Sequence, residues 1–295
     1  MKIKFILNPT AGIKDSTKCI EKVVKILGSG SEVNIQFTQK RYDAFYIAKQ
    51  AAGEDYDAII GGGGDGTINQ VVNGLMSSGK PVTAGFIPLG TSNAYAMSLG
   101  IPSDPIRASE IILDNHTREV DLGRTNSGSG YYYFINMAGA GFDAQTVGSV
   151  NPKHTKYLGG IVAHIIAGAR SIFTSSIEQL HVEVDGEKHD CYQVFIFNGM
   201  FYGGFIKAAP LADMTDGYLD VYLFRKGSKG DVVRYFSGVI GRYHTRMKDV
   251  DHFQAKHIKV NASEEVLVHL DGEVIGTLPR EFDVHPKGMR VLVPK

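Results

Sequence analysis

A glycine-rich stretch that carries one carboxylate is the clearest chemical feature of this chain. Four consecutive glycines precede Asp65, Gly66 and Thr67, between the apolar run 57–60 and a run with helical spacing of apolar residues, 68–76. Glycine lets a ligand approach the main-chain N–H groups closely, and a following helix directs the positive end of its dipole to the same place. The stretch therefore predicts a phosphate-binding loop.

Asp65 indicates that a cation accompanies the phosphate, because a carboxylate among phosphate-binding amides would otherwise repel the ligand. Mg²⁺ is the expected ion. The stretch also satisfies Gly-x-Gly-x-x-Gly, but a dinucleotide fold needs an acidic residue about 20 positions further on, where this chain has 85–88, Gly-Phe-Ile-Pro. A P-loop is excluded because Gly79-Lys80 is followed by Pro81 and not by Ser or Thr.

The elements around this loop alternate between strand and helix up to about Gly123, which predicts a parallel sheet covered by helices. Thr67 and Gln70 are spaced as a capping box, so we expect the helix after the glycines to begin there. A helix is also expected over 16–27, where apolar residues form one face. The expected strands are 2–7, 32–38, 57–60, 83–88 and 118–121.

Three loops rich in Gly, Asn and Thr follow strands in this half: 8–12, 61–67 and 88–93. The carboxyl ends of parallel strands meet at one edge of a sheet, where ligands bind. One such loop is usually only a turn, but three at matching positions predict a shared site.

The pattern changes from Tyr131 onward to short strands joined by Gly and Asp turns, which predicts a β-sandwich. Two helical insertions are expected, at 156–173 and 229–243, and 125–130 is expected to be a linker. We therefore expect an α/β domain over 1–124, completed by 286–295 if the last strand joins it, and a sandwich domain over 125–285.

The composition favours a cytoplasmic protein without a nucleic-acid partner. The net charge is zero, and the basic residues are spread along the chain instead of forming a phosphate-binding stripe. The two cysteines, Cys19 and Cys191, are far apart and expected to be reduced. The N-terminus matches a strand and not a signal peptide, and the longest apolar stretch, 158–169, is too short to span a bilayer. Any membrane contact is expected to be peripheral.

The second half contains two acidic loops. Asp213, Asp216 and Tyr218 lie in a segment that is either an ordinary turn with solvated carboxylates or a Mg²⁺ site completed by backbone carbonyls. Asp271-Gly272-Glu273, taken alone, is a hairpin turn.

Together these segments resemble the diacylglycerol kinase catalytic family, which includes bacterial lipid kinases and the sphingosine and ceramide kinases. The resemblance covers nearly the whole chain. The matching residues are Asn8-Pro9-Thr10-Ala11-Gly12, Gly63-Gly64-Asp65-Gly66-Thr67 with Asn69, Asn73 and Gly74, Pro88-Leu89-Gly90-Thr91 with Asn93, Asn198-Gly199, Gly203-Gly204, Pro210, Asp216-Gly217-Tyr218-Leu219-Asp220 and Asp271-Gly272-Glu273.

The resemblance implies an ATP- and Mg²⁺-dependent kinase that phosphorylates a lipid hydroxyl, with diacylglycerol, giving phosphatidic acid, as the expected acceptor. It implies Glu273 as general base, Asp271 as the second choice, and Asp65 acting through Mg²⁺. Asp216 would anchor a structural cation. The ATP site would include Asn8, Pro9, Thr10, Ala11, Gly12, Thr38, Gly63, Gly64, Asp65, Gly66, Thr67, Asn69, Gly90, Thr91 and Asn93.

One departure concerns the position after Asn93, where the family pattern has Asp and this chain has Ala94. With one carboxylate fewer, Mg²⁺ would bind more weakly. Two alternatives stay open: a soluble-substrate kinase resembling NAD kinase, which shares Gly-Gly-Asp-Gly, and, because of Ala94, a nucleotide- or lipid-binding regulator that has lost catalysis. For the lipid kinase we expect a location at the inner membrane face, with Arg242, His244, Arg246 and Lys248 as candidate contacts to anionic headgroups, and exposed sheet edges would permit a homodimer.

Overall fold

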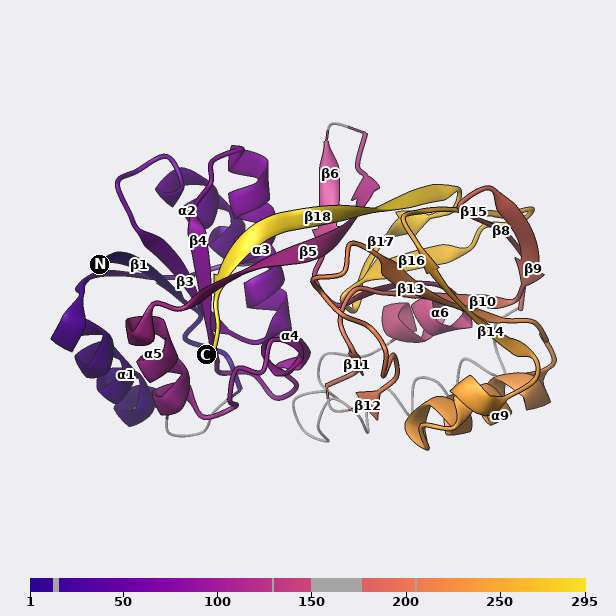
Figure 1. Ribbon diagram of the computed structural model, residues 1–295, viewed down its shortest axis with the longest axis horizontal. Helices are drawn as coiled ribbons and strands as arrows, with labels where there is room; N and C mark the ends of the chain where they lie inside the picture. The colour runs from indigo at the N-terminus through magenta and orange to yellow at the C-terminus, as the bar shows by residue number, and fades with distance from the viewer. Residues whose placement is uncertain (13–15, 129, 150–176, 205) are drawn as a thin grey trace. The chain divides into compact units, whose positions relative to one another are not determined.

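The computed structural model describes residues 1–12, 16–128, 130–149, 177–204 and 206–295 (Figure 1). The helix expected at 156–173 lies outside the described residues. The chain forms two compact units, Met1–Leu122 with Pro286–Lys295, and Gly123–His285. It passes from one unit to the other within two strands, β5 (Thr117–Asn126) and β18 (Arg280–Leu292).

The first unit is built on a parallel sheet with the strand order β2-β1-β3-β4, and Val291 near the end of β18 pairs in parallel with Ala84 of β4. This arrangement agrees with the alternation of strands and helices in the sequence. The elements are β1 (Lys2–Leu7), α1 (Ser16–Gly30), β2 (Glu32–Phe37), α2 (Asp43–Ala51), β3 (Ala58–Gly63), α3 (Asp65–Ser78), β4 (Thr83–Pro88), α4 (Ala94–Ser98) and α5 (Pro105–Asp114).

Helices cover both faces of this sheet, α1 with α5 on one and α2 with α3 on the other (Figure 1). Alternate residues of β1, such as Phe5 and Leu7, share a buried cluster with Val23 and Leu27 of α1. Residues that point to both faces are buried, which explains why the strands are almost continuously apolar.

Strand β3 is longer than the sequence suggested. It continues through Gly61 and Gly62 to Gly63, all buried, and these three glycines pair with Phe86, Ile87 and Pro88 of β4. Three of the four glycines are therefore strand residues, and only Gly64 lies between the strand and α3.

The second unit is a β-sandwich, as the turn-rich sequence predicts, so the expected fold class is confirmed. One sheet has the order β14 (Val250–Ala255), β13 (Leu219–Phe224), β10 (Gln193–Phe197), β7 (Met137–Gly141), β16 (Leu267–Leu270) and β17 (Glu273–Thr277). The other contains β9 (Glu187–Cys191), β8 (Leu180–Val184), β15 (His257–Ala262) and the first part of β18, together with β6 (Tyr131–Phe134) and the end of β5. A cluster that includes Ile196, Leu223, Val260 and Phe282 fills the space between the sheets. Thr125 and Asn126, the first residues of the expected linker, are the last residues of β5.

The outer face of the six-stranded sheet packs against α9, whose start is fixed by a capping box between Ser228 and Asp231. This helix confirms the second expected insertion. The elements of the unit are β6 (Tyr131–Phe134), β7 (Met137–Gly141), α6 (Phe142–Ser149), β8 (Leu180–Val184), β9 (Glu187–Cys191), β10 (Gln193–Phe197), β11 (Phe201–Tyr202), β12 (Ile206–Lys207), β13 (Leu219–Phe224), α9 (Lys229–Ile240), the 3₁₀ turn His244–Arg246, β14 (Val250–Ala255), β15 (His257–Ala262), β16 (Leu267–Leu270) and β17 (Glu273–Thr277).

Candidate functional site

The loops that follow β1, β3 and β4 meet at the carboxyl edge of the parallel sheet, as their sequence positions predict. The N–H of Asn8 donates to the Gly62 carbonyl, and the N–H of Leu89 donates to the Gly63 carbonyl, both at 2.9 Å. The loops of Gly64 and Gly90 approach so closely that a Cβ on Gly90 would lie 2.5 Å from the Cα of Gly64. Glycine at position 90 is therefore required by this packing.

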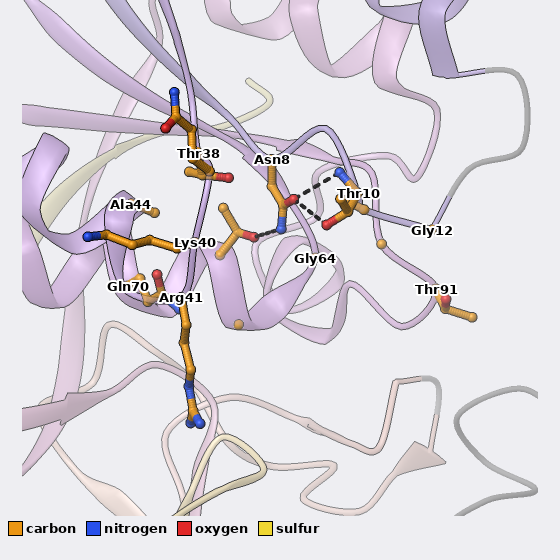
Figure 2. Close-up of a pocket in the computed structure, with 15 residues that line it drawn as sticks. Asn8, Thr10, Gly12, Thr38, Lys40, Arg41, Ala44, Gly64, Gln70 and Thr91 are labelled. Atoms are coloured by element: carbon orange, nitrogen blue, oxygen red, sulfur yellow. Dashed lines mark hydrogen bonds between the residues drawn. The ribbon is translucent and has the colours of Figure 1, made fainter. Parts of the chain in front are cut away.

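These loops line a polar cavity of about 590 Å³ (Figure 2), a size typical of small-ligand sites. Ten of the residues expected at the ATP site are in its lining: Asn8, Thr10, Ala11, Gly12, Thr38, Gly64, Gly66, Thr67, Gly90 and Thr91.

The side chain of Asn8 connects two of the loops. Its Oδ1 accepts hydrogen bonds from the Thr10 backbone N–H at 3.0 Å and from Thr10 Oγ1 at 2.9 Å, and its Nδ2 donates to Thr67 Oγ1 at 3.0 Å (Figure 2). Because all its polar atoms are engaged, Asn8 fixes the first loop against the start of α3.

The expected capping box at Thr67 is wrong. Helix α3 begins at Asp65 with Gly64 as its N-cap, and no side chain caps it. Thr67 Oγ1 bonds to Asn8 instead. A 14-residue helix whose N-terminus lacks a side-chain cap and borders a cavity directs its dipole toward any ligand there, which favours an anion.

Five residues expected at the ATP site are not in the cavity lining. Gly63 is a buried strand residue, and Asn69 bonds to Asn73. Asn93 is buried, and its amide bonds to both the N–H and the carbonyl of Gly90, at 3.0 and 2.8 Å, so it shapes the third loop from behind. The remaining two are Pro9, which is exposed, and Asp65.

The Asp65 carboxylate faces the start of α4. Its Oδ1 accepts a hydrogen bond from the N–H of Tyr95 at 3.2 Å. Burial raises the pKa of Asp65, opposed by hydrogen bonds from the backbone of Tyr95, Ala94 and Asn93. Position 94, where the family pattern has Asp, is thus adjacent to Asp65, so the departure affects the surroundings of this carboxylate directly.

Five residues that were not among those expected to bind ATP also line the cavity: Gln39, Lys40, Arg41, Ala44 and Gln70. Lys40, Arg41 and Gln70 lie on the side opposite Thr91 (Figure 2). The turn after β2 is held by the Asp43 carboxylate, which accepts the N–H groups of Gln39 and Lys40 at 2.7 and 2.9 Å; these bonds lower the pKa of Asp43. The position of this turn after a parallel strand was the sequence signal that could have placed it at the site.

In the second unit, the carboxylate of Asp271 bonds to the backbone of a neighbouring segment. One carboxylate oxygen accepts the N–H of Ile135 at 2.7 Å, and the other accepts those of Asn136 and Met137, each at 2.9 Å. Glu273, two residues on, begins β17 and is exposed. The turn therefore presents Glu273 while Asp271 holds it in place.

In the loop with Asp213, Asp216 and Tyr218, both carboxylates accept hydrogen bonds from neighbouring protein groups. Asp213 accepts hydrogen bonds from the Thr215 N–H and hydroxyl, and Asp216 accepts those of the Tyr218 N–H and the Gln254 amide. Burial, together with the negative charges of Asp220 and Asp213, raises the pKa of Asp216. In the described part of the chain, no group of three or more His, Cys, Asp or Glu could hold a metal ion. A cation in this loop stays a prediction.

Comparisons with known proteins assign the two units to two family models. A model described as the diacylglycerol kinase catalytic domain matches residues 2–125, and one described as the YegS C-terminal NAD kinase beta sandwich-like domain matches residues 136–293. The fold and the loops thus define a two-part kinase.

Relatives along the full length lead to the same family. The diacylglycerol kinase of Bacillus subtilis (strain 168) is 33% identical over 100% of this chain and 97% of its own length, and that of Staphylococcus carnosus (strain TM300) is 30% identical over 100% and 95%. Two solved Bacillus anthracis str. Sterne structures with diacylglycerol kinase names align with TM-scores of 0.84 and 0.79, at 26% and 24% identity, over 99% of this chain and 95% and 97% of theirs. The chain belongs to the diacylglycerol kinase catalytic domain family.

Among the described residues, every helix is too short or too polar to span a lipid bilayer.

Proposed function

We propose that this protein transfers the γ-phosphoryl group of ATP to the hydroxyl of a lipid, with diacylglycerol as the acceptor and phosphatidic acid as the product. The observation that carries the proposal is the cavity in which the three family loops meet. The names of the full-length relatives support the choice of acceptor.

In this proposal, the phosphates of ATP occupy the part of the cavity beside α3. Main-chain N–H groups of Gly64, Gly66 and Thr67 would bind them, together with the helix dipole. The first loop, through Thr10 and Gly12, would close this part from another side. The remaining wall, which includes Thr38, Lys40, Arg41 and Gln70, is then left for the nucleoside.

The chemistry of the donors fits a single Mg²⁺ that is held partly by ATP itself. Mg²⁺ commonly uses one or two carboxylates together with substrate phosphates and water. Asp65, which lies between the lining residues Gly64 and Gly66, would supply one carboxylate, and Ala94 supplies none. Bound there, Mg²⁺ would neutralise charge on the phosphates, and this chain should need more of it than a relative with Asp at both positions.

Glu273 is the proposed general base, which takes the proton of the acceptor hydroxyl. Two observations favour it over Asp271. Glu273 is exposed and begins a strand, whereas the Asp271 carboxylate already accepts three backbone N–H groups. Proton transfer of this kind typically contributes about 10²- to 10⁴-fold to the rate.

A lipid acceptor also requires contact with a membrane surface, and α9 has suitable residues. Val233 and Ile240, seven positions apart and so on one helix face, are 49% and 42% exposed, and Tyr243 is 44% exposed. The basic residues Arg242, Arg246 and Lys248 follow or flank them. His244 was expected on this surface, but that expectation is wrong, because His244 is buried and its Nε2 contacts the Ala208 carbonyl at 2.8 Å.

Vesicle sedimentation tests this contact. Ile240→Asp should reduce binding to anionic vesicles roughly tenfold, the loss expected for one buried aliphatic side chain plus an added negative charge. Tyr46→Asp, at an exposed aromatic residue of α2, is the matched control and should bind as the wild type does. Equal binding by Ile240→Asp would remove α9 from the proposed contact. Light scattering on the protein without vesicles would test the predicted homodimer.

The function itself is tested by transfer of labelled γ-phosphate from ATP to vesicles that contain diacylglycerol, monoacylglycerol, sphingosine or ceramide, with and without Mg²⁺. Labelled phosphatidic acid as the main product is the expected result. A labelled product from another lipid would change the acceptor but not the reaction class. Tight ATP binding without transfer to any acceptor would contradict the proposal and favour the binding protein.

A further inference from the structure

Asp143 and His269 form a hydrogen-bonded pair that is almost completely removed from water. Asp143 Oδ2 lies 2.6 Å from His269 Nε2, and the two residues are only 6% and 1% exposed. Burying polar groups of this kind costs free energy unless every atom is paired. The pair therefore suggests a role beyond packing.

The sheet is constructed to accommodate this imidazole. Along β16, Val268 and Leu270 enter the core between the two sheets, so His269 projects to the opposite face. On the neighbouring strand β7, His269 pairs with Gly139, where a Cβ would lie 2.4 Å from His269 Nε2. Any larger residue at position 139 would displace the ring.

Asp143 is fixed from three sides. Its N–H donates to Gln193 Oε1 at 2.9 Å, and its Oδ1 accepts the hydroxyl of Tyr202. Burial and the negative charge of Asp143 raise the pKa of Tyr202 well above its usual value, so this hydroxyl remains a donor. With both carboxylate oxygens engaged, Asp143 holds the His269 ring in one orientation.

The other nitrogen of His269 reaches the turn that carries Glu273. The N–H of Gly272 donates to His269 Nδ1 in a long hydrogen bond of 3.4 Å. The tautomer follows from these partners: Nε2–H donates to the carboxylate, and Nδ1 accepts. The residue before Gly272 is Asp271, whose carboxylate accepts the N–H groups of Ile135, Asn136 and Met137. The turn is therefore held from two sides.

We infer that His269 is a positioning residue for Glu273: anchored by Asp143, it accepts the Gly272 N–H and so fixes the orientation of the turn from which Glu273 projects. This inference rests on the proposed role of Glu273 as general base. Misplacement of a catalytic group by about 1 Å commonly costs about 100-fold in rate.

Two variants separate the nitrogens of the ring. In His269→Asn the side-chain oxygen can replace Nδ1 as acceptor for Gly272, whereas in His269→Gln the side-chain amide can replace Nε2 as donor to Asp143. We expect kcat for lipid phosphorylation to fall about 10- to 100-fold in His269→Gln and to recover in part in His269→Asn, with KM for ATP unchanged in both. An unchanged kcat in folded His269→Gln would overturn the inference.

Combination with Glu273→Gln distinguishes positioning from general destabilisation. If His269 acts through Glu273, His269→Gln should reduce the residual kcat of Glu273→Gln no further. A second reduction of the same size would show that His269 acts elsewhere. If Glu273→Gln alone keeps the wild-type kcat, the proposed base is wrong, and this result is distinct from a failure of the His269 inference.

Hydrogen exchange gives a readout that does not depend on activity. In His269→Gln, the amide of Gly272 should exchange about tenfold faster or more, while the amides of Ile135 and Met137, which donate to Asp271, should keep their protection. Unchanged exchange at Gly272 would contradict the inference. Loss of protection across the whole sheet would also contradict it, because it would show a general structural role.

Discussion

In the first unit the candidate cavity is lined largely by main chain and small residues, whereas in the second unit the turn before Glu273 is held by the side chains of Asp271 and His269. The loops around the cavity leave no space for a side chain between Gly64 and Gly90, because these two residues are nearly in contact. The second depends on particular polar atoms. The first site should therefore be disrupted by adding atoms, and the second by removing or exchanging them.

The largest effect is expected at Glu273. Glu273→Gln keeps the size of the side chain and removes the base, so kcat for lipid phosphorylation should fall about 10²- to 10⁴-fold. ATP affinity, measured by calorimetry, should not change, because the cavity lining contains only residues of the first unit. Glu265→Gln, at an exposed residue close by in the sequence, is the control and should keep full activity.

Gly90→Ala tests the opposite kind of change. The added Cβ would lie 2.5 Å from the Gly64 Cα and force the two loops apart, so ATP affinity should fall about 10- to 100-fold. In Gly28→Ala the added Cβ meets nothing within 4 Å, so this helix variant should bind ATP normally and be slightly more stable. Normal ATP affinity in Gly90→Ala would separate the cavity from nucleotide binding.

Asp271→Asn should lower the stability of the protein and also, because Asp271 holds the turn before Glu273, the kcat of the folded molecules. It places an amide NH₂ opposite at least one backbone N–H group, which should reduce the free energy of unfolding in urea by about 1–3 kcal/mol. A large loss of kcat with unchanged stability would instead make Asp271 the base.

Ala94→Asp should restore the missing carboxylate beside Asp65. We expect the Mg²⁺ concentration for half-maximal activity to fall roughly three- to tenfold, because a second carboxylate would help to hold the ion. Ala96→Ser on the same short helix is the control. A higher Mg²⁺ requirement in Ala94→Asp would show that the added charge repels the phosphates instead.

The smallest effect concerns His244. Burial lowers its pKa below the usual value, so below pH of about 6.5 the unfolded chain binds a proton more readily than the folded protein, and stability falls as the pH falls. One such proton accounts for at most about 1.4 kcal/mol per pH unit. Between pH 7 and pH 5, His244→Gln should lose less stability in urea titrations than the wild type; an equal loss would assign the pH dependence to other groups.

The same comparison explains what could be predicted from the sequence. The loops of the first unit are local, and the three strand-loop pairs at β1, β3 and β4 predicted their convergence. The local sequence was misleading where a residue type suits two structures. Thr67 matched a capping box, but its hydroxyl bonds to Asn8. Gly61–Gly63 resembled a loop, but they continue β3.

In the second unit, pairing between strands distant in sequence makes the important contacts. Asp143 and His269 are 126 positions apart, and nothing in the local sequence of either indicates the other. Asp271 resembled an ordinary turn residue because its partners, Ile135 to Met137, lie far away in the chain. Contacts of this kind require the register of β7 against β16.

The most direct test of the central claim is a competition in one reaction, with ATP, Mg²⁺, vesicles that contain diacylglycerol, and NAD, followed by mass spectrometry of all phosphorylated products. The account predicts phosphatidic acid from the wild type, strongly reduced in Glu273→Gln, and no phosphorylated NAD. Phosphorylated NAD as the main product would contradict the lipid kinase and favour the soluble-substrate kinase.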